Sequence, residues 1–429
     1  MLRPVLTFFA ATTLLALHAQ SPALIGYWHN WNDASAPYIP LDQIDPRYNV
    51  VEVAFAEPVA GSTYVVEFVP EFEVPADFIA QVAAQKALGK TVVISLGGAN
   101  ATIQLNSDQE RDWFIGHVMY LFSVYGFNGL DLDLEGSSVA ISGGTIAAPV
   151  DSTVIRLIHA VKEVMAQYHA LTGEKLFLTM APETAYLQGG QSAFGGIWGA
   201  YLPIVDALRD SLDILQVQLY NSGSMYGIDG GIYTQGTADF IVSQTEAVIQ
   251  GFNTIGGFFD GLAPEKVAAA LPACASAAGG GYADTATVRM AMEYLLGDGP
   301  QPGAYTLAQT GGYPGLRGMM TWSINWDAVS ACDGVYSYAE NFERIFGEVS
   351  TDVEELPRGT IALSPNPVQN TLRFGSPVHG AITIRDLSGR IVQREEGTGM
   401  RSVVDVGTLR PGIYLLDIKG SFPQRFVKE

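Results

Sequence analysis

The chain has 429 residues, of which 48% are hydrophobic and 16% are charged, and its formal net charge is -21. This length suits a barrel-sized unit with a small appendage, and the apolar content excludes a disordered chain. The negative charge excludes nucleic acid and anionic lipid as partners held by basic patches, so we expect a neutral or cationic partner.

The first 19 residues are typical of a secretory signal peptide. Arg3 precedes an apolar run from Val5 to Leu17, and small and polar residues follow up to Gln20. The run is too short to span a bilayer as a mature helix, and we expect cleavage after Ala19. No later stretch is long and apolar enough to cross a membrane, so we expect an exported protein without a transmembrane anchor.

Residues 20–346 show a repeated alternation of short apolar segments and helix-length stretches. Such alternation predicts βα units around a parallel sheet, and eight units predict a closed (β/α)8 TIM barrel of the α/β class. The eight predicted strands are Leu24–Trp28, Asn49–Ala56, Thr91–Leu96, Gly129–Leu134, Leu176–Met180, Leu212–Leu219, Lys266–Leu271 and Gly318–Ile324.

Two of the intervening stretches carry apolar residues at helical spacing behind Asp or Ser caps. They predict helices over Asp108–Tyr125 and Asp151–Leu171, with the apolar stripes as packing faces. The stretch between Tyr220 and Lys266 has room for a loop and a helix, and we expect no additional domain there.

In the fourth predicted strand, acids alternate with leucines from Leu130 to Glu135. A strand has a period of two, so Asp131, Asp133 and Glu135 share one face and the leucines share the other. In a barrel the leucines would pack against helices and the acids would point inward, with Glu135 nearest the C-terminal mouth. Acids that are buried together raise one another's pKa, which produces a proton donor.

Two carboxylates in one site suggest a glycosidase, and Asp133 and Glu135 would lie on the same side of its bound sugar. Glycosidases commonly use two carboxylates on opposite sides of the scissile bond. Two neighbours on one strand instead suit a donor and its helper, so the nucleophile must come from elsewhere. The acetamido oxygen of the substrate is the simplest source.

Over residues 24 to about 345 the chain resembles the family 18 glycoside hydrolases, and more closely their compact bacterial chitinases. Their DGxDxDxE motif is matched from Asn128 to Glu135, with Asn128 as the one departure. The remaining motifs fall at predicted strand ends in the family's order. They are Ser95-Leu96-Gly97-Gly98, Met180-Ala181-Pro182-Glu183, Gln216-Val217-Gln218-Leu219-Tyr220-Asn221 and Thr321-Trp322-Ser323.

The resemblance implies roles for five residues. Glu135 would protonate the glycosidic oxygen and later deprotonate water. Asp133 would hold the acetamido N-H and stabilise the oxazolinium ion, while Asp131 would share a proton with Asp133. Tyr220 would donate its hydroxyl to the acetamido carbonyl, with Gln218 alongside.

Further residues at strand ends are predicted to contact sugar. Trp322 would form the hydrophobic floor under the sugar at the cleavage site, because the C-H face of a pyranose packs on an aromatic ring. Met180 and Glu183 are predicted sugar contacts, as are Tyr27 and Trp28.

For Trp28, Trp31 and Trp326, stacking on a polymer and packing beneath loops both stay open. The six histidines lack metal-ligand spacing, so we expect neither a metal nor a cofactor. Gly279-Gly280-Gly281 lacks the Lys-Ser/Thr of a phosphate loop and is predicted to be a flexible loop. Cys274 and Cys332 either form a disulfide or stay unpaired.

Residues 347–359 are polar and acidic, as a linker would be. From Arg358 onward ten Lys/Arg accompany six Asp/Glu, whereas 13 basic and 38 acidic residues precede it. Residues 360–429 contain alternating runs between turn residues, which predict a small all-β sandwich. The four runs are Ala381–Arg385, Arg401–Val406, Gly412–Ile418 and Gln424–Lys428.

This C-terminal module resembles the sorting domain of the type IX secretion system. The similar pieces are Leu363-Ser364-Pro365-Asn366-Pro367, Leu409-Arg410-Pro411-Gly412-Ile413-Tyr414 and Arg425-Phe426-Val427-Lys428. The resemblance implies export, with the type IX machinery as a partner and removal of the module at the outer membrane. A carbohydrate-binding sandwich is the alternative, and the absence of tryptophan from this part of the sequence favours sorting.

Together these observations predict a secreted, monomeric, endo-acting chitinase that binds chitin and chito-oligosaccharides. The alternatives are an endo-β-N-acetylglucosaminidase that cuts N-glycan cores and a catalytically silent chitin-binding lectin. Retention of Asp133, Glu135 and Tyr220 argues against the lectin.

Overall fold

The structure is a computed structural model that describes residues 22–329, 331–347, 363–379, 382–386, 390–395, 400–418 and 424–429. The chain divides into two compact units between Thr351 and Asp352. The predicted signal peptide and residues 348–359 of the predicted linker lie outside the described residues. The domain boundaries drawn from the sequence therefore stay predictions.

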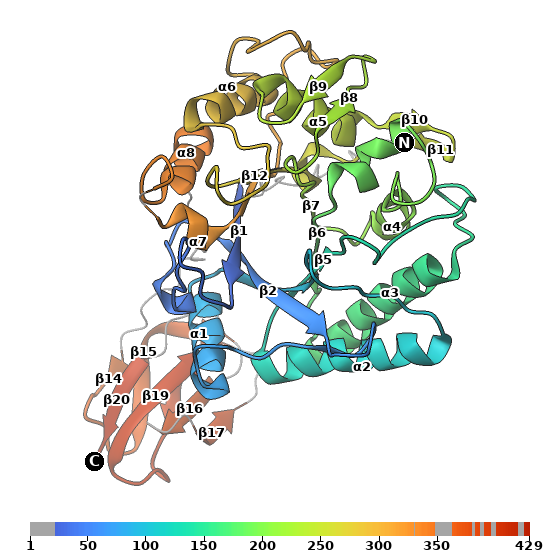
Figure 1. Cartoon of the computed structure of the whole chain (residues 1–429). Coiled ribbons are helices and arrows are strands. Elements are labelled where there is room, and N and C mark those ends of the chain that lie inside the picture. Colours follow the sequence, from blue (N-terminus) through green and yellow to red (C-terminus); the bar gives the residue numbers. More distant parts are fainter. Residues whose placement is uncertain are drawn as a thin grey trace, which may run out of the picture. The chain divides into compact units, whose positions relative to one another are not determined.

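The first unit is a nearly closed barrel of eight parallel strands with helices around it (Figure 1). Neighbouring strands pair in parallel, β13 pairs with β1, and β7 meets β12 through the single bridges Leu215–Val267 and Gln218–Ala270. This architecture confirms the predicted (β/α)8 fold. In their order around the barrel the strands are β1 (Ala23–His29), β2 (Val50–Pro58), β4 (Thr91–Gly97), β5 (Gly129–Asp133), β6 (Phe177–Met180), β7 (Ile214–Leu215), β12 (Ala268–Pro272) and β13 (Gly318–Trp322).

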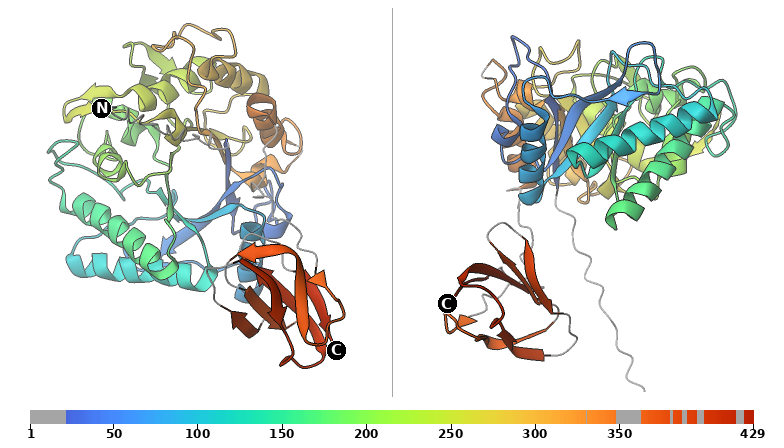
Figure 2. Two further views of the ribbon diagram at one scale, coloured as in Figure 1. Left: turned by 180° about the vertical axis from the view of Figure 1, so that it is seen from behind. Right: turned by 90° about the horizontal axis from the view of Figure 1, so that it is seen from below.

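The helices lie outside the strands, and α2 and α3 run side by side (Figures 1 and 2). Both helices predicted from periodicity are confirmed, and the Ser107 hydroxyl caps α2 by accepting a hydrogen bond from the Glu110 N-H at 3.2 Å. The α-helices are α1 (Pro75–Ala87), α2 (Asp108–Tyr125), α3 (Ser152–Thr172), α4 (Leu202–Leu208), α5 (Ala238–Gln250), α6 (Thr285–Leu296), α7 (Ile324–Asp327) and α8 (Ser337–Phe346). Short 3-10 helices occupy Leu41–Gln43, Thr184–Tyr186, Gln188–Gln191 and Pro264–Lys266.

The barrel unit has two separate hydrophobic layers. The outer layer fills the space between strands and helices and includes Leu130, Leu132 and Leu178. The inner layer contains several small side chains, among them Ala54 and Ala270. Small residues inside the barrel leave room for buried polar groups, and these groups form the floor of the site described below.

Two predicted strands end at least two residues earlier in the structure than the sequence predicts. The segment Leu212–Leu219 forms regular pairing only at β7, and Gln218 beyond it makes single bridges to Glu183 and Ala270. The segment Gly318–Ile324 ends at Trp322, because Ser323 caps α7 through its hydroxyl, which accepts a hydrogen bond from the Trp326 N-H at 3.4 Å.

The stretch between Tyr220 and Lys266 holds two small hairpins and α5, which confirms that no domain is inserted there. The hairpins are β8 (Ser224–Tyr226) with β9 (Ile232–Thr234), and β10 (Phe252–Thr254) with β11 (Gly257–Phe259). A further strand, β3 (Val66–Glu67), pairs antiparallel with the end of β2. Over the residues that the structure describes, no helix has the length and apolar character needed to cross a bilayer.

The second unit consists of two small antiparallel sheets that contribute to one hydrophobic cluster. The four predicted strands are present, and three others were missed. Thr371–His379 was missed because its Gly-Ser-Pro sequence is typical of a turn, whereas the structure places a register shift there, between Arg373 and Val378. The strands are β14 (Leu363–Ser364), β15 (Thr371–His379) and β18 (Met400–Asp405) in one sheet, and β17 (Ile391–Glu395), β16 (Ile382–Asp386), β19 (Gly412–Ile418) and β20 (Gln424–Lys428) in the other.

Candidate active site

A cavity of about 810 Å³ opens at the C-terminal ends of the barrel strands. This is the end at which barrel enzymes carry their chemistry, because loops from several strands meet there. Its wall combines aromatic rings, carboxylates and amides, and a loop of small residues. The lining residues are Trp31, Phe55, Glu57, Glu71, Ala99, Asn100, Asp133, Glu135, Gln218, Tyr220, Asn221, Ser276, Ala277, Ala278, Gly279 and Trp322.

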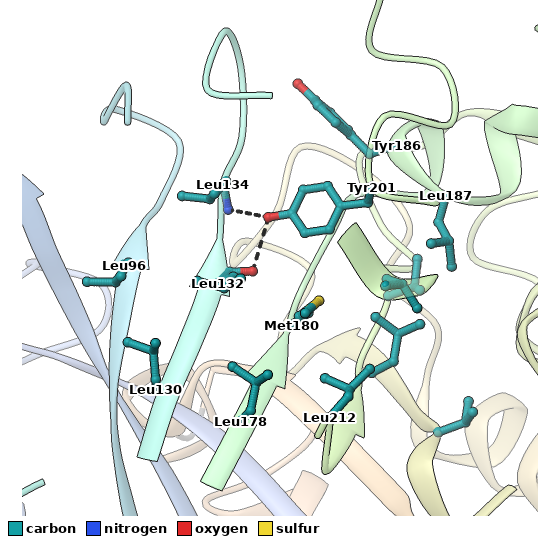
Figure 3. Close-up of a cluster of buried hydrophobic side chains, with 14 of the residues drawn as sticks. Leu96, Leu130, Leu132, Leu134, Leu178, Met180, Tyr186, Leu187, Tyr201 and Leu212 are labelled. Atoms are coloured by element: carbon teal, nitrogen blue, oxygen red, sulfur yellow. Dashed lines mark hydrogen bonds between the residues drawn. The ribbon is translucent and has the colours of Figure 1, made fainter. Parts of the chain in front are cut away.

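The acids of the β5 segment point toward the barrel interior and the cavity, as the alternation predicts. Asp131 and Asp133 are buried, and Glu135 lines the cavity two residues beyond the end of β5. The leucines between them belong to the outer hydrophobic layer, where Leu134 lies close to Gly97 of β4 (Figure 3).

The turn after β4 passes directly beside Asp133. Gly98 donates its N-H to the Asp133 carbonyl oxygen at 2.8 Å, and a Cβ on Gly97 would lie 2.2 Å from that oxygen. Gly97 also has a φ of +117°, which side chains disfavour. These two glycines therefore allow the turn to pass close to the acidic strand.

Asp133 and Glu135 share one hydrogen-bond donor. The Gln218 side-chain N-H₂ lies 2.8 Å from Asp133 Oδ1 and 3.0 Å from Glu135 Oε1, and it also reaches the Ala181 carbonyl at 3.0 Å. Burial, followed by the negative charges of Glu135 and Asp131, raises the pKa of Asp133 well above its usual range. The site therefore favours a protonated carboxyl group over a further buried negative charge.

Asp131 lies deeper and is held by hydroxyl groups. Tyr27 and Ser95 donate to its Oδ2, each at 2.7 Å, and the Thr179 hydroxyl lies 2.7 Å from its Oδ1. Tyr27 is 1% exposed and is not a lining residue of the cavity. The structure therefore directs the hydroxyl of Tyr27, a predicted sugar contact, to Asp131 and not into the cavity.

Tyr220 lines the cavity although most of its surface is buried. Burial and the charges of Asp133 and Glu135 raise its pKa well above the usual value, so the hydroxyl keeps its proton. Gly281 packs against it, since a Cβ there would lie 2.6 Å from Tyr220 Cα. The glycine loop predicted to be flexible thus forms part of the cavity wall through Gly279.

Aromatic rings form one side of the cavity. Trp322 lies nearly parallel to Phe55, with ring centroids 5.8 Å apart and an interplanar angle of 11°. Trp31 is 6.2 Å from each of these rings. The structure therefore places Trp31 and Trp322 on the cavity wall, where a sugar ring can stack.

Two predicted sugar contacts do not reach the cavity. Trp28 is fully buried, donates its indole N-H to the Ile39 carbonyl at 2.7 Å and packs on Phe78. Met180 is also fully buried in the outer hydrophobic layer (Figure 3). These side chains point outward from their strands toward helices and loops, and for Trp28 this favours packing over stacking.

Trp326 and Glu183 also lie outside the cavity lining. Trp326 is partly buried against the outer layer, which favours packing over stacking for this residue. Glu183 is half-buried, and burial followed by the charge of Glu135 raises its pKa. Its influence on the site is therefore electrostatic.

The sequence did not single out several lining residues. Phe55 and Glu57 lie at the end of β2, so the rule that barrel chemistry occurs at strand ends was enough to find them. Asn221, which the sequence placed at the end of the Gln216–Asn221 motif without a role, has a φ of +54°. Glu71 and the loop Ser276–Gly279 carry no pattern that marks them as site residues.

A disulfide joins Cys274 and Cys332, which resolves the two alternatives that the sequence left open. Cys274 directly precedes the loop that lines the cavity, and Cys332 follows α7. The bond therefore connects the segments that follow β12 and β13, on the side of the site that Trp322 occupies.

Comparison with known proteins gives consistent matches. The chain is 45% identical over 310 residues to Chitinase Chi52 of Paenibacillus xylanexedens and 44% identical over 311 residues to Chitinase D of Niallia circulans. Each alignment covers 71% of this chain and 58% of the relative, so the chain spans less than two thirds of these relatives. Chitinase ChiA of Flavobacterium johnsoniae is 34% identical over 372 residues, which cover 81% of this chain and 23% of that protein.

Solved structures of chitinases are similar to this chain in fold and in sequence. A family GH18 chitinase from Chromobacterium violaceum superimposes with a TM-score of 0.66 at 39% identity, covering 76% of this chain and 83% of the other. Putative Chitinase A from Streptomyces coelicolor has a TM-score of 0.60 at 31% identity, covering 74% and 98%. Residues 362–428 match the secretion system C-terminal sorting domain, and residues 23–296 match the glycosyl hydrolases family 18. The chain belongs to glycosyl hydrolase family 18 and ends in a secretion sorting domain.

Proposed function

We propose that the protein is a secreted chitinase that hydrolyses internal β-1,4 linkages of N-acetylglucosamine polymers with retention of configuration. The observation that carries this proposal is the shared contact of Asp133 and Glu135 with the Gln218 amide. Two carboxyl groups so close together, on one wall of the cavity, do not flank a sugar from opposite faces. The curated relatives named chitinases support the same substrate class.

In the first step the substrate supplies the nucleophile. Glu135 donates its proton to the glycosidic oxygen while the acetamido carbonyl oxygen attacks the anomeric carbon, and the bond to the leaving sugar breaks. Asp133 accepts the acetamido N-H and stabilises the positive charge of the resulting oxazolinium ion. Tyr220 keeps its proton and donates it in a hydrogen bond to the acetamido oxygen, which orients that oxygen for attack.

In the second step Glu135 acts as a base. It takes a proton from water, the water oxygen attacks the anomeric carbon, and the oxazolinium ring reopens to the acetamide. Two inversions give net retention. Trp322 supports the sugar at the cleavage site through contact with its C-H face. Asp131, which is held by three hydroxyl groups, shares a proton with Asp133.

The sorting domain supports a proposal about export. The signal peptide would take the chain across the inner membrane, and the type IX machinery would recognise the C-terminal unit and release the enzyme outside the cell or at its surface. Intact-mass spectrometry of the secreted protein tests this. The expected mass lacks residues 1–19 and the C-terminal unit, and retention of that unit on the mature protein would contradict its role as a removable signal.

Product analysis tests the activity. The full chain is incubated with chitohexaose and, separately, with a high-mannose glycoprotein. We expect internal cleavage of chitohexaose to shorter oligosaccharides with the β-anomer formed first, and no release of glycan from the glycoprotein. Release of intact N-glycans would establish the endo-β-N-acetylglucosaminidase instead. Binding of chitohexaose without any cleavage would establish the lectin.

A further inference from the structure

Glu52 is a buried acid to which the catalytic scheme above gives no role. It lies on β2 in the barrel interior with 0% exposure. Its Oε1 is 2.6 Å from the Gln216 side-chain nitrogen and 2.9 Å from the Thr179 hydroxyl oxygen. Its Oε2 has no hydrogen-bond partner among the residues that the structure describes.

The Thr179 hydroxyl contacts two carboxyl groups at once. Its oxygen lies 2.9 Å from Glu52 Oε1 and 2.7 Å from Asp131 Oδ1. A hydroxyl carries a single hydrogen and can donate to one of these oxygens. The other contact is a hydrogen bond only if the carboxyl group itself carries the hydrogen, so one of the two acids is protonated.

The surroundings decide which acid is protonated. Asp131 also accepts hydrogen bonds from Tyr27 and Ser95, and such donors stabilise a charged carboxylate. Glu52 has one oxygen without a donor, and an unpartnered buried charge is costly. Burial raises the pKa of both acids, and the negative charge of Asp131 adds to the rise at Glu52, which the Gln216, Thr179 and Tyr27 side chains oppose without cancelling it.

We propose that Glu52 is a neutral positioning residue whose carboxyl proton is donated to Thr179, so that the Thr179 hydroxyl donates to Asp131 and fixes the charge there. The direction in which these hydrogen bonds donate depends only on the folded structure and not on whether the protein is an enzyme. Its effect on the rate rests on the proposed function, because it acts through the carboxyl groups of Asp131, Asp133 and Glu135.

The titratable groups that face Glu52 set the expected effect of pH. They are Tyr27 on β1, Asp131 and Asp133 on β5, and Tyr220 after the β7 segment. Thr179 on β6 and Gln216 in the β7 segment also face Glu52 and do not titrate. Ionisation of Glu52 at alkaline pH would reverse the Thr179 hydrogen bond and add a negative charge beside Asp133. The added charge opposes the charged form of Asp133, and the reversed hydrogen bond removes a donor from Asp131.

The first measurement is infrared spectroscopy of the full chain, wild type against Glu52→Gln, at pH 7. The difference spectrum is expected to show the carbonyl stretch of one protonated carboxyl group present in the wild type and lost in the variant. Absence of that band overturns the proposal. This readout does not require activity, so the proposed function can fail while the assignment of Glu52 stands.

The second measurement compares Glu52→Leu with Glu52→Gln in the pH dependence of kcat/KM on a chito-oligosaccharide. The leucine variant is expected to lose about tenfold, because Thr179 loses its donor and Asp131 is less well fixed. Glutamine should recover most of this loss, since Gln216 Oε1 has no partner among the described residues and can accept the new amide. The two pKa values of the profile should match between wild type and Glu52→Gln.

Lower pKa values in the Glu52→Gln profile, by about one unit, would show that a negative charge had been removed and would overturn the proposal. If Glu52→Gln does not fold, protein labelled with carboxyl-¹³C glutamate decides the question. Because Glu135 can also carry a proton, the label is read in Glu135→Gln protein, where at least one glutamate resonance should keep the chemical shift of a protonated acid up to pH 8. Ionisation of every glutamate below that pH contradicts the assignment.

Discussion

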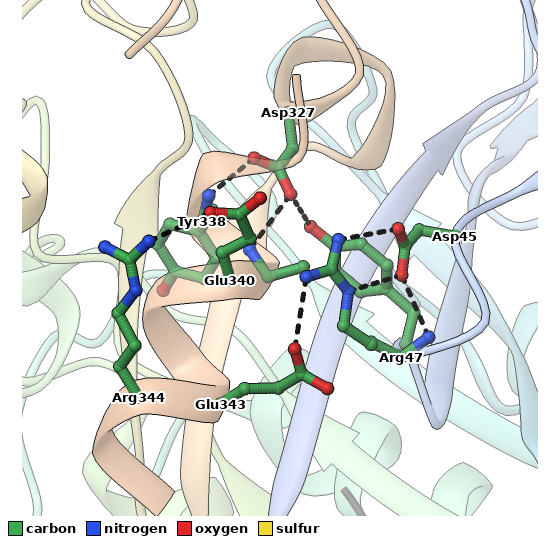
Figure 4. A network of polar contacts seen from close by, with 9 residues as sticks. Asp45, Arg47, Asp327, Tyr338, Glu340, Glu343 and Arg344 are labelled. Carbon is green, nitrogen blue, oxygen red and sulfur yellow. Dashed lines mark hydrogen bonds and ion pairs between the residues drawn. The ribbon is translucent and has the colours of Figure 1, made fainter. Parts of the chain in front are cut away.

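Buried carboxylates occur in two regions of the barrel unit, and their partners differ. At the end of α7, Asp327 accepts the Tyr48 hydroxyl at 2.7 Å and the backbone N-H groups of Tyr338 at 2.7 Å and Ala339 at 3.1 Å (Figure 4). Burial raises the pKa of Asp327 to about 6, and these donors together with Arg47 oppose the rise. Asp327 is therefore charged at neutral pH.

Inside the barrel the carboxyl groups face one another. Asp133 shares the Gln218 amide with Glu135, and Glu52 has one oxygen without a donor. Burial raises the pKa of Asp133 and of Glu52 well above the usual range, and the charges of other carboxylates add to this effect.

The comparison shows that burial alone does not determine what an acid does. A carboxylate surrounded by donors holds a negative charge and ties loops and helices together. Carboxyl groups that lie beside each other with few donors hold protons and can exchange them. Changes in the inner region should therefore alter the rate, and changes at Asp327 should alter stability.

The largest effect is expected from Glu135→Gln. An amide cannot transfer the proton, so kcat should fall by about 10²–10⁴-fold, while the binding of chito-oligosaccharides and the melting temperature stay close to those of the wild type. Steady-state kinetics and calorimetric binding measure the two effects separately. Glu183→Gln is the matched control, because Glu183 lies outside the cavity lining, and it should lose less than about tenfold. Substantial turnover by Glu135→Gln would contradict the assignment of Glu135 as the proton donor.

An intermediate effect is expected from Tyr201→Phe. The Tyr201 hydroxyl accepts the Leu134 N-H at 2.8 Å and donates to the Leu132 carbonyl at 3.1 Å, which holds the backbone just before Glu135 (Figure 3). Its loss leaves a buried N-H unpaired, so unfolding should become easier by about 1–3 kcal/mol. The kcat should fall by about 10- to 100-fold through misplacement of Glu135.

Tyr125→Phe is the control for this change. The Tyr125 hydroxyl also donates to a backbone carbonyl, that of Phe68 at 2.8 Å, at a position that does not line the active-site cavity. This variant should lose stability without loss of kcat. An equal loss of kcat in both variants would show that any weakening of the barrel lowers the rate, and the two regions would no longer be distinguishable by this measurement.

The smallest effect on the rate is expected from Asp327→Asn, which should change stability. In the folded protein the pKa of Asp327 is about 6, above its unfolded value of about 3.9, so the folded state binds the proton more tightly. This contribution is complete below about pH 4 and is lost as the pH rises through 6, a loss of about 2–3 kcal/mol. The asparagine variant does not titrate, so its stability deficit should be largest at pH 4 and should shrink toward pH 7.

Denaturant unfolding at several pH values checks this, followed by tryptophan fluorescence, since all six tryptophans precede residue 351. Asp45→Asn is a control of opposite sign. Burial alone would raise the pKa of Asp45, but its hydrogen bonds with Arg47 lower it overall, so the deficit of this variant should grow as the pH rises (Figure 4). A deficit at Asp327 that is independent of pH would contradict the folded-state pKa given above.

Periodicity was sufficient for much of the architecture. The alternation in Leu130–Glu135 predicted which side chains face inward, because a strand has only two faces. Trp28 and Met180 were predicted to contact sugar because they lie near strand ends. Their segments show no such alternation of acids and leucines to indicate which way each side chain points, and both point away from the cavity. Glu52 was not identified because a single acid in an apolar strand forms no pattern, and its partners come from β5, β6 and the β7 segment.

The bond between Cys274 and Cys332 has a consequence for laboratory work. It fixes the segment that precedes the cavity loop Ser276–Gly279. Protein made in a reducing cytoplasm, or assayed with added thiol, would lack this bond, and the loop would be held less firmly. Kinetic constants from different preparations become comparable only after free thiols are counted. Expression with an export signal, followed by purification without reductant, yields the protein in the form that meets its substrate.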